Sequence, residues 1–204
     1  MGTEPIDYSR EWYEKTYHED WSDWVQISDA DTLRAHYAQF THYHERFLMW
    51  FRAFPSISGR LLELGFNNGK SMYWFASKYP ELTIDGIDFS TSLIGTAKLF
   101  PQLCANIRHV VIGDVGCLPF RSASYEFVSC LDMIEHLPEP VYLAMLSEVT
   151  RVLVPGGLVF VHVGTHPQPE HIHIVPNEKV IFDLYRTGFS LYYALPDFLC
   201  LQKN

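Results

Sequence analysis

A glycine-rich turn is the first feature of this sequence that could do chemistry. The segment LLELGFNNGKS, residues 61–71, joins an apolar run to a turn that contains Gly65 and Gly69. Glycine lets the backbone approach a ligand closely, and the free amides of a helix that starts there can donate to it. The pattern predicts a ligand-binding turn between a buried strand and a helix. A tight connection that binds nothing is the alternative, because short glycine motifs need context.

An acidic residue supplies some of that context. The segment TIDGIDFS, residues 83–90, is typical of a second strand that ends at Asp88. Roughly twenty residues separate Asp88 from the turn, which is the spacing at which a carboxylate meets the ribose hydroxyls of an adenosine ligand. Asp88 could instead cap the next helix with Ser90, and both roles can hold together. These two motifs are equally compatible with NAD and with S-adenosylmethionine.

Several histidines lie near the expected ligand site. His136 follows a fourth strand, His162 lies within a fifth, and His166, His171 and His173 lie in the loop after it. They could act as a general base, form a metal site from His171 and His173 with His166, or serve only structure and substrate packing. We take His136 as the candidate base because it comes directly after the strand, and we assign no metal ligand.

Alternating β-type and helical runs must position these groups. We expect strands near 60–64, 83–87, 108–112, 126–131 and 157–163, and helices over 69–79, 91–99, 139–153 and 177–187. Such alternation favours βαβ units and a mainly parallel sheet with helices on both faces.

The last two β-type runs differ from the others. Residues 189–195 and 197–203 are joined directly at Pro196, and strands with so short a connection can pair only antiparallel. The predicted fold is therefore an α/β Rossmann-like three-layer sandwich. Its seven-stranded, mostly parallel sheet ends in an antiparallel hairpin.

From about residue 60 to its end, the chain resembles the class I S-adenosylmethionine-dependent methyltransferases of the small-molecule type. Besides the glycine turn, the resemblance is carried by GDVGCLPF (113–120), EFVSCLDMIEHL (126–137) and RVLVPGGLVFVHV (151–163). The terminal hairpin also fits this family, whereas the sheet of an NAD-binding Rossmann fold would continue parallel. Several motifs in the family's order make the resemblance specific.

The resemblance implies roles for individual residues. The turn would surround the methionine part of S-adenosylmethionine, Asp88 would bind the ribose, Asp114 would read the adenine edge, and Leu131 would lie beside the sulfonium. The cofactor-binding residues so implied are Glu63, Gly65, Phe66, Asn67, Gly69, Asp88, Phe89, Ser90, Asp114, Val115, Leu131 and Asp132. The sequence departs from the family pattern at Asn67, which replaces a glycine. Asparagine tolerates left-handed backbone angles better than most residues do, so the turn can survive.

The first 55 residues are rich in aromatic residues and have helical apolar spacing from Thr32 to Phe54. We expect 1–55 to be a helical, aromatic lid segment and 56–204 to be the cofactor-binding domain. A lid would exclude water from the reaction, whereas the alternative is that these aromatics only seal the helix against the sheet. The residues expected to contact the substrate are Tyr17, Trp21, Tyr43, His166 and His171.

Composition restricts the partners. The net charge is −9 and the 15 Lys and Arg form no basic stripe, so nucleic acid is disfavoured. No apolar run is long enough for a membrane span, and the N-terminus has no signal-peptide core. Four widely spaced cysteines predict no disulfide framework, which favours a reducing cytoplasm. The N-terminal aromatics could also serve a homodimer interface.

The expected activity is methyl transfer from S-adenosylmethionine to an O, N or C nucleophile of a small-molecule acceptor. One alternative is a non-catalytic module that binds the cofactor or regulates a partner, which Asn67 favours. Another is an aminopropyl transferase, for which Asp132 and Glu135 could form the acidic pocket that a polyamine needs.

Overall fold

A computed structural model describes residues 27–39, 41–164 and 171–204, with no side-chain description for 41–43. A seven-stranded sheet has the order β3-β2-β1-β4-β5-β7-β6. Its strands are β1 (Gly59–Leu64), β2 (Leu82–Asp88), β3 (Ile107–Ile112), β4 (Tyr125–Leu131), β5 (Leu153–His162), β6 (Phe189–Leu195) and β7 (Phe198–Lys203). β1 to β5 pair in parallel, and β7 pairs antiparallel with both β5 and β6. The predicted Rossmann-like architecture and its terminal hairpin are confirmed.

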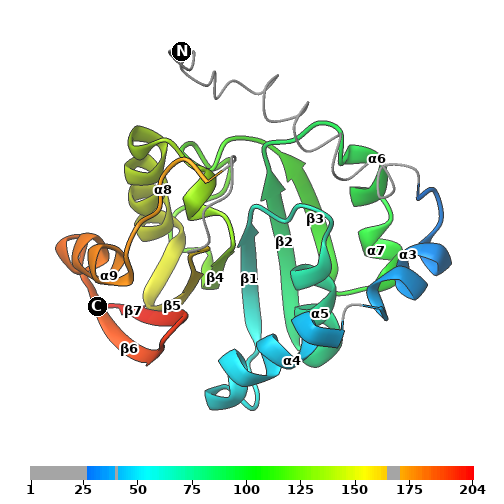
Figure 1. Cartoon of the computed structure of the whole chain (residues 1–204), viewed down its shortest axis with the longest axis horizontal. Coiled ribbons are helices and arrows are strands. Elements are labelled where there is room, and N and C mark those ends of the chain that lie inside the picture. The colour runs from blue at the N-terminus through cyan, green and yellow to red at the C-terminus, as the bar shows by residue number, and fades with distance from the viewer. Residues whose placement is uncertain (1–26, 40, 165–170) are drawn as a thin grey trace, which may run out of the picture.

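Helices cover both faces of the sheet (Figure 1). One face carries α8 (Glu139–Val152) and α9 (Asn177–Arg186). The other carries α3 (Ala30–Tyr37), α4 (Thr41–Trp50), α5 (Lys70–Lys78), α6 (Ile94–Ala97), α7 (Phe100–Leu103) and the 3-10 turn η1 (Phe51–Ala53). A second 3-10 turn, η2 (Ile134–His136), follows β4. None of the helices among the described residues has both the length and the apolar composition that crossing a membrane requires.

The two faces of the sheet have separate cores because successive strand residues point to opposite sides. Leu61 packs with α5 and the N-terminal helices, whereas its neighbours Leu62 and Leu64 pack with α8 and α9. Trp50 and Phe51 of the N-terminal segment are buried in the first of these cores. The described part of residues 1–55 is therefore integral to the packing of the sheet.

Two predicted elements differ from the observed ones. The single helix expected over 91–99 is replaced by the short helices α6 and α7. Pro101 lies in the first turn of α7, and a proline ring disfavours a helix that continues through it from the N-terminal side. β5 begins at Leu153, four residues before the expected strand. The Pro155-Gly156-Gly157 segment forms a bulge within β5. Tyr125 of β4 pairs with Leu153, whereas Phe127, two residues further along β4, pairs with Leu158.

Candidate functional site

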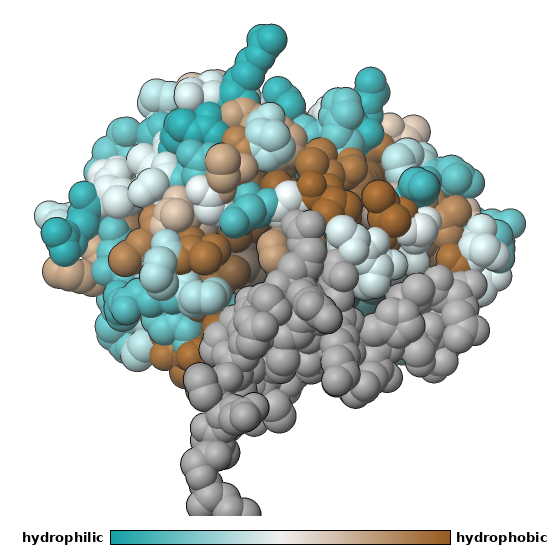
Figure 2. Space-filling view, turned by 90° about the horizontal axis from the view of Figure 1, so that it is seen from above, coloured by the Kyte–Doolittle hydropathy of each residue, from teal (hydrophilic) through white to brown (hydrophobic). Residues whose placement is uncertain are grey.

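The carboxyl ends of β1, β2 and β4 meet where the strand order reverses. β1 pairs with β2 on one side and with β4 on the other, so the chain leaves these strands in opposite lateral directions. Ligands of open α/β sheets bind at such a switch point. Figure 2 looks onto this edge from above and shows apolar and hydrophilic residues side by side on it.

The turn after β1 has the left-handed backbone that its sequence predicts. Gly65, Asn67 and Gly69 have φ angles of 71°, 45° and 79°. A side chain at Gly69 would overlap the Phe100 ring, and one at Gly65 would overlap Met133. Asn67 therefore occupies the left-handed region that asparagine tolerates, as predicted. α5 starts at Lys70, immediately after the turn.

Asp88 is buried beneath this turn at the end of β2. Its Oδ2 accepts a hydrogen bond from the Asn67 amide at 2.7 Å, and its Oδ1 accepts one from the Ser90 amide at 2.9 Å. Burial raises the pKa of Asp88, and the amide donors partly offset this effect. The next helix begins only at Ile94, so Asp88 and Ser90 do not cap it. The carboxylate instead joins the two turns that flank the edge of the sheet.

Glu63 supports the glycine turn from within the sheet. Its carboxylate is fully buried and accepts hydrogen bonds from Ser71 of α5, at 2.6 Å, and from Ser129 of β4. Burial raises its pKa to about 7, against the lowering effect of the two hydroxyl donors. The group therefore couples the start of α5 to both central strands.

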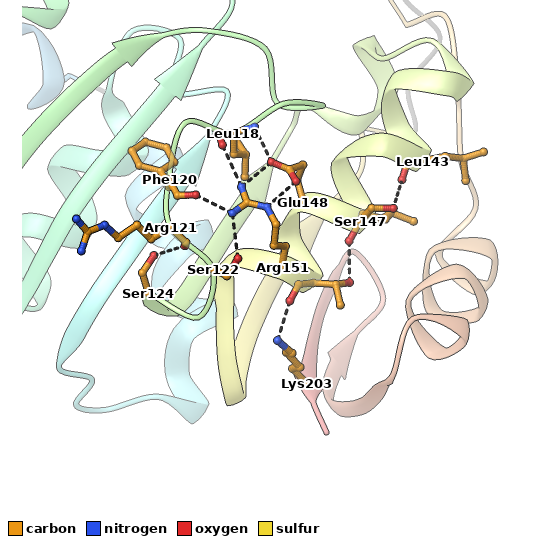
Figure 3. A network of polar contacts seen from close by, with 12 residues as sticks. Leu118, Phe120, Arg121, Ser122, Ser124, Leu143, Ser147, Glu148, Arg151 and Lys203 are labelled. Carbon is orange, nitrogen blue, oxygen red and sulfur yellow. Dashed lines mark hydrogen bonds and ion pairs between the residues drawn. The ribbon is translucent and has the colours of Figure 1, made fainter.

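The loop that carries Asp114 is fastened to α8 by one arginine (Figure 3). The Arg151 guanidinium donates to the carbonyl oxygens of Leu118 and Phe120 at 3.0 and 2.7 Å. It also pairs with Glu148, which accepts a bond from the Leu118 amide at 2.7 Å. Asp114 itself is exposed, and its Oδ1 accepts the Gly116 amide at 2.7 Å.

Asp132 follows β4 with a φ of 53° and contacts a buried histidine. Its Oδ1 lies 2.6 Å from Nδ1 of His162, and Nε2 of His162 lies 2.6 Å from the Arg46 guanidinium. Because a guanidinium only donates, Nε2 must accept and Nδ1–H must donate to Asp132. Burial opposes ionisation of Asp132, but the His162 bond and the Arg46 charge together hold its pKa below the ordinary value. His162 therefore has no acceptor nitrogen left for a general base.

Lys70 and Glu135 both interact electrostatically with Asp132, and the pKa of each is shifted. Burial lowers the pKa of Lys70 to about 8, and the nearby Asp132 charge partly restores it. Burial raises the pKa of Glu135 to about 7, and Asp132 adds to that rise. Strongly shifted groups that converge in this way are typical of functional sites.

Two of the predicted histidines lie side by side in the structure, and a third packs elsewhere. His136 lies in η2, with its ring 4.9 Å from that of His171. His173 packs edge-on against Tyr142 and lies outside the cluster of described residues that contains His171. The amides of Ile172 and His173 both donate to the carbonyl oxygen of Glu135.

Other predicted site residues are buried or half-buried, or fall outside the described chain. Phe66, Val115 and Leu131 have side chains that pack in the two cores. Phe89 is half-buried directly after β2, and Ser90 is buried with its hydroxyl 2.7 Å from that of Ser92. Tyr17, Trp21 and His166 lie outside the described residues, and Tyr43 lies in α4 without a described side chain.

A cavity of about 360 Å³ lies between α5 and the N-terminal helices. Lys70 and Tyr73 line it from α5, and Tyr37 and Phe47 line it from α3 and α4. The Tyr37 hydroxyl donates to the carbonyl oxygen of Asn68, which attaches the cavity wall to the glycine turn. The described chain thus has aromatic-lined space beside the candidate site.

Sequence reasoning did not identify Arg46 or Lys70. Arg46 reaches His162 across 116 positions of sequence, and no local pattern predicts so distant a contact. Lys70 carried a usable signal, because it is the first residue of the helix that leaves the glycine turn.

Comparison with known proteins agrees with this geometry. Residues 61–157 match the family model described as a methyltransferase domain. A demethylmenaquinone methyltransferase of Staphylococcus haemolyticus is 31% identical over 102 residues, covering 50% of this chain and 39% of that protein. A ubiquinone biosynthesis O-methyltransferase of Paraburkholderia xenovorans is 31% identical over 116 residues, covering 55% and 48%. The chain thus spans less than half the length of these relatives.

A solved structure extends the likeness in fold. It is Haemonchus contortus phosphoethanolamine N-methyltransferase 2 in complex with S-adenosyl-L-methionine, with a TM-score of 0.64 and 19% identity. The alignment covers 93% of this chain and 46% of that one. At this identity the likeness establishes the fold alone.

Proposed function

We propose that this chain, whose residues 61–157 match the methyltransferase-domain model, is a class I S-adenosylmethionine-dependent methyltransferase that transfers a methyl group from S-adenosylmethionine to an O, N or C nucleophile of a small-molecule acceptor. This proposal rests on the position of Asp88. Its buried carboxylate accepts a hydrogen bond from the Asn67 amide of the left-handed turn, at the switch point of the sheet. A carboxylate in this place can accept hydrogen bonds from ribose hydroxyls.

The residues of the site fit such a cofactor. Oδ1 of Asn67 is buried without a hydrogen-bond partner, and an unpaired buried acceptor is costly unless a ligand donor satisfies it. The glycine turn leaves room for close approach to the backbone. We assign cofactor binding to Glu63, Gly65, Phe66, Asn67, Gly69, Asp88, Phe89, Ser90, Asp114, Val115, Leu131 and Asp132. Glu63 acts by holding the turn through Ser71.

S-adenosylmethionine, when bound, supplies an electrophilic methyl group on a sulfonium. The protein must then orient the acceptor, exclude water and hold or remove a proton. Asp132, kept ionised by His162 and Arg46, places a negative charge at the end of β4. His136, four residues further along the chain, is the proposed base.

The acceptor would be selected by the N-terminal segment and by the loop after β5. We propose that residues 1–55 act as the lid segment and 56–204 as the cofactor domain. Aromatic walls around the cavity beside α5 suit an acceptor with an apolar body. Tyr17, Trp21, Tyr43, His166 and His171 remain the proposed contacts with the acceptor.

We also propose the protein's partners and its compartment. A net charge of −9 argues against nucleic acid as the acceptor. Cys104, Cys117, Cys130 and Cys200 are free thiols, which suits the cytoplasm. Phe182 and Tyr185 of α9 are 57% and 70% exposed beside the edge strand β6, a surface that would suit a homodimer.

The test of the activity is S-adenosylhomocysteine formation. The purified chain is incubated with S-adenosylmethionine and, in turn, phenols, amines and activated carbon acids, and S-adenosylhomocysteine is measured. We expect acceptor-dependent product formation, which Asp88→Ala slows at least about tenfold when S-adenosylmethionine is far below saturation. Binding of S-adenosylmethionine without product from any acceptor would instead favour a non-catalytic module.

A further inference from the structure

One cluster at the end of β4 combines a carboxylate with two imidazoles. Glu135 and His136 lie in η2, and His171 reaches them from the segment that follows β5. One ligand atom from each of the three side chains lies within 4.8 Å of the other two. Around an ion with bonds of about 2.1 Å, tetrahedral ligand atoms stand about 3.4 Å apart. Closing the cluster on an ion therefore requires movements of about an ångström.

Glu135 has an unsatisfied atom in this cluster. The residue is 1% exposed, and its Oε2 is buried without a hydrogen-bond partner. Its Oε1 accepts the Gly164 amide at 2.8 Å, so the carboxylate is held in one orientation. A buried carboxylate oxygen without a donor costs free energy that a bound cation would recover.

The backbone builds the cluster independently of its side chains. The carbonyl oxygen of Glu135 accepts the amides of Ile172 and His173 at 2.9 and 3.1 Å, which places His171 beside η2. At Gly164 any side chain would overlap Oε1 of Glu135 and press on His171. The position next to the carboxylate therefore requires glycine.

We propose that Glu135, His136 and His171 bind one divalent transition-metal ion. One carboxylate and two imidazoles suit Zn²⁺, Fe²⁺ or Mn²⁺ better than Ca²⁺ or Mg²⁺, which prefer oxygen ligands. Nearby Asp132 adds negative charge that favours a cation. Three protein ligands leave at least one coordination position for another molecule.

The open position gives the ion a role that rests on the proposed methyl transfer. The cluster follows directly after Asp132 at the carboxyl edge of the sheet. An acceptor oxygen bound there would be polarised and would lose its proton more easily. His136 would then serve as a metal ligand, and the acceptor would need no histidine base.

Metal binding is tested directly on the full chain. The protein is stripped with EDTA and titrated with Zn²⁺ by calorimetry and with Co²⁺ by visible absorption. We expect one ion per chain, and at least about tenfold weaker binding in Glu135→Gln and in His171→Ala, because each loses a ligand. His109→Ala is the matched control, since this exposed histidine of β3 contacts Asp85 of β2 and is remote from η2.

Folding of the variants is checked by circular dichroism. Glu135→Gln keeps the acceptor for the Gly164 amide, and Gly164→Ala provides a second route because it displaces the carboxylate without removing a ligand. We expect both to lose affinity for Zn²⁺. Wild-type protein that retains no ion, or Glu135→Gln with wild-type affinity, would overturn the proposal.

The same samples separate this inference from the proposed function. Each is also titrated with S-adenosylhomocysteine. If the chain binds that nucleoside but no metal, only the metal site fails. If it binds the metal but not the nucleoside, only the methyltransferase proposal fails.

Discussion

Buried carboxylates give the candidate site its chemical character at the scale of single residues. Glu63, Asp88 and Glu135 lie at or just beyond the carboxyl ends of three strands and are at most 4% exposed. Burial raises the pKa of each, because removing a charge from water is costly. The folded chain keeps these acids buried at a cost in stability, which is typical of sites shaped for ligands.

Glu63 permits a test of this cost. Its pKa rises from 4.5 in the unfolded chain to about 7, so the folded protein binds the proton more tightly. The free energy of unfolding should therefore fall as the pH rises from about 4.5 to about 7. The loss attributable to Glu63 is on the order of 3 kcal/mol at most, at 1.36 kcal/mol per pKa unit.

We expect Glu63→Gln to be more stable than wild type at pH 8 and to lose that advantage by pH 4.5. Urea unfolding of both proteins across this range measures the difference, in which the contributions of Asp88 and Glu135 cancel. A difference that does not change with pH would contradict the assigned burial of the charge.

Residue types near the strand ends could be predicted, but their partners could not. The positions of Asp88 and Asp114 follow from the strand pattern and from the family resemblance. The contact between Glu63 and Ser129 spans 66 positions of sequence, and that between Arg46 and His162 spans 116. Such pairs depend on how strands are ordered in the sheet, which local spacing does not encode.

At the scale of elements, apolar periodicity predicted most strands and helices to within a few residues. It failed where backbone chemistry overrides periodicity. Pro101 separates α6 from α7, and Gly156, with a φ of 78°, allows a bulge inside β5. Both deviations lie outside the turns that form the candidate site.

The glycine turn should tolerate no side chain at Gly69. Gly69 and Gly156 have φ angles of 79° and 78°, so alanine at either carries nearly the same backbone strain, about 1–2 kcal/mol. Only at Gly69 would the new Cβ overlap Phe100, whereas nothing lies within 4 Å at Gly156. We expect Gly69→Ala to destabilise the chain by at least about 1 kcal/mol more than Gly156→Ala does. Equal losses in urea unfolding would disprove the packing role of Gly69.

At the scale of the whole molecule, the described N-terminal helices and the sheet share one core. Trp50 stacks on His162 and on Phe198, with ring centroids 4.6 and 5.4 Å apart. Asp29 caps α3 through the Thr32 amide at 2.8 Å. The lid proposed for residues 1–55 must therefore depend mainly on the residues before Asp29.

Deleting residues 1–26 leaves the Asp29 cap and the shared core intact. We expect the truncated protein to melt within a few degrees of the full chain and to lose at least about tenfold in turnover, because water would reach the reacting groups. Thermal unfolding and S-adenosylhomocysteine formation give the two readouts. Full activity after truncation would eliminate the lid.

The proposed cofactor site requires that the carboxyl edge of β1 and β2 binds an adenosyl group through Asp88. Calorimetric titration of S-adenosylhomocysteine into wild type, Asp88→Ala and Asp183→Ala measures this binding. Asp183 is the matched control, because it is a hydrogen-bonded carboxylate on α9, on one outer face of the sheet. We predict at least about tenfold weaker binding for Asp88→Ala, since hydrogen bonds to a charged group are worth about 1.5–3 kcal/mol. We predict wild-type affinity for Asp183→Ala. Unchanged affinity in Asp88→Ala, or no binding to the wild-type chain, would contradict the claim.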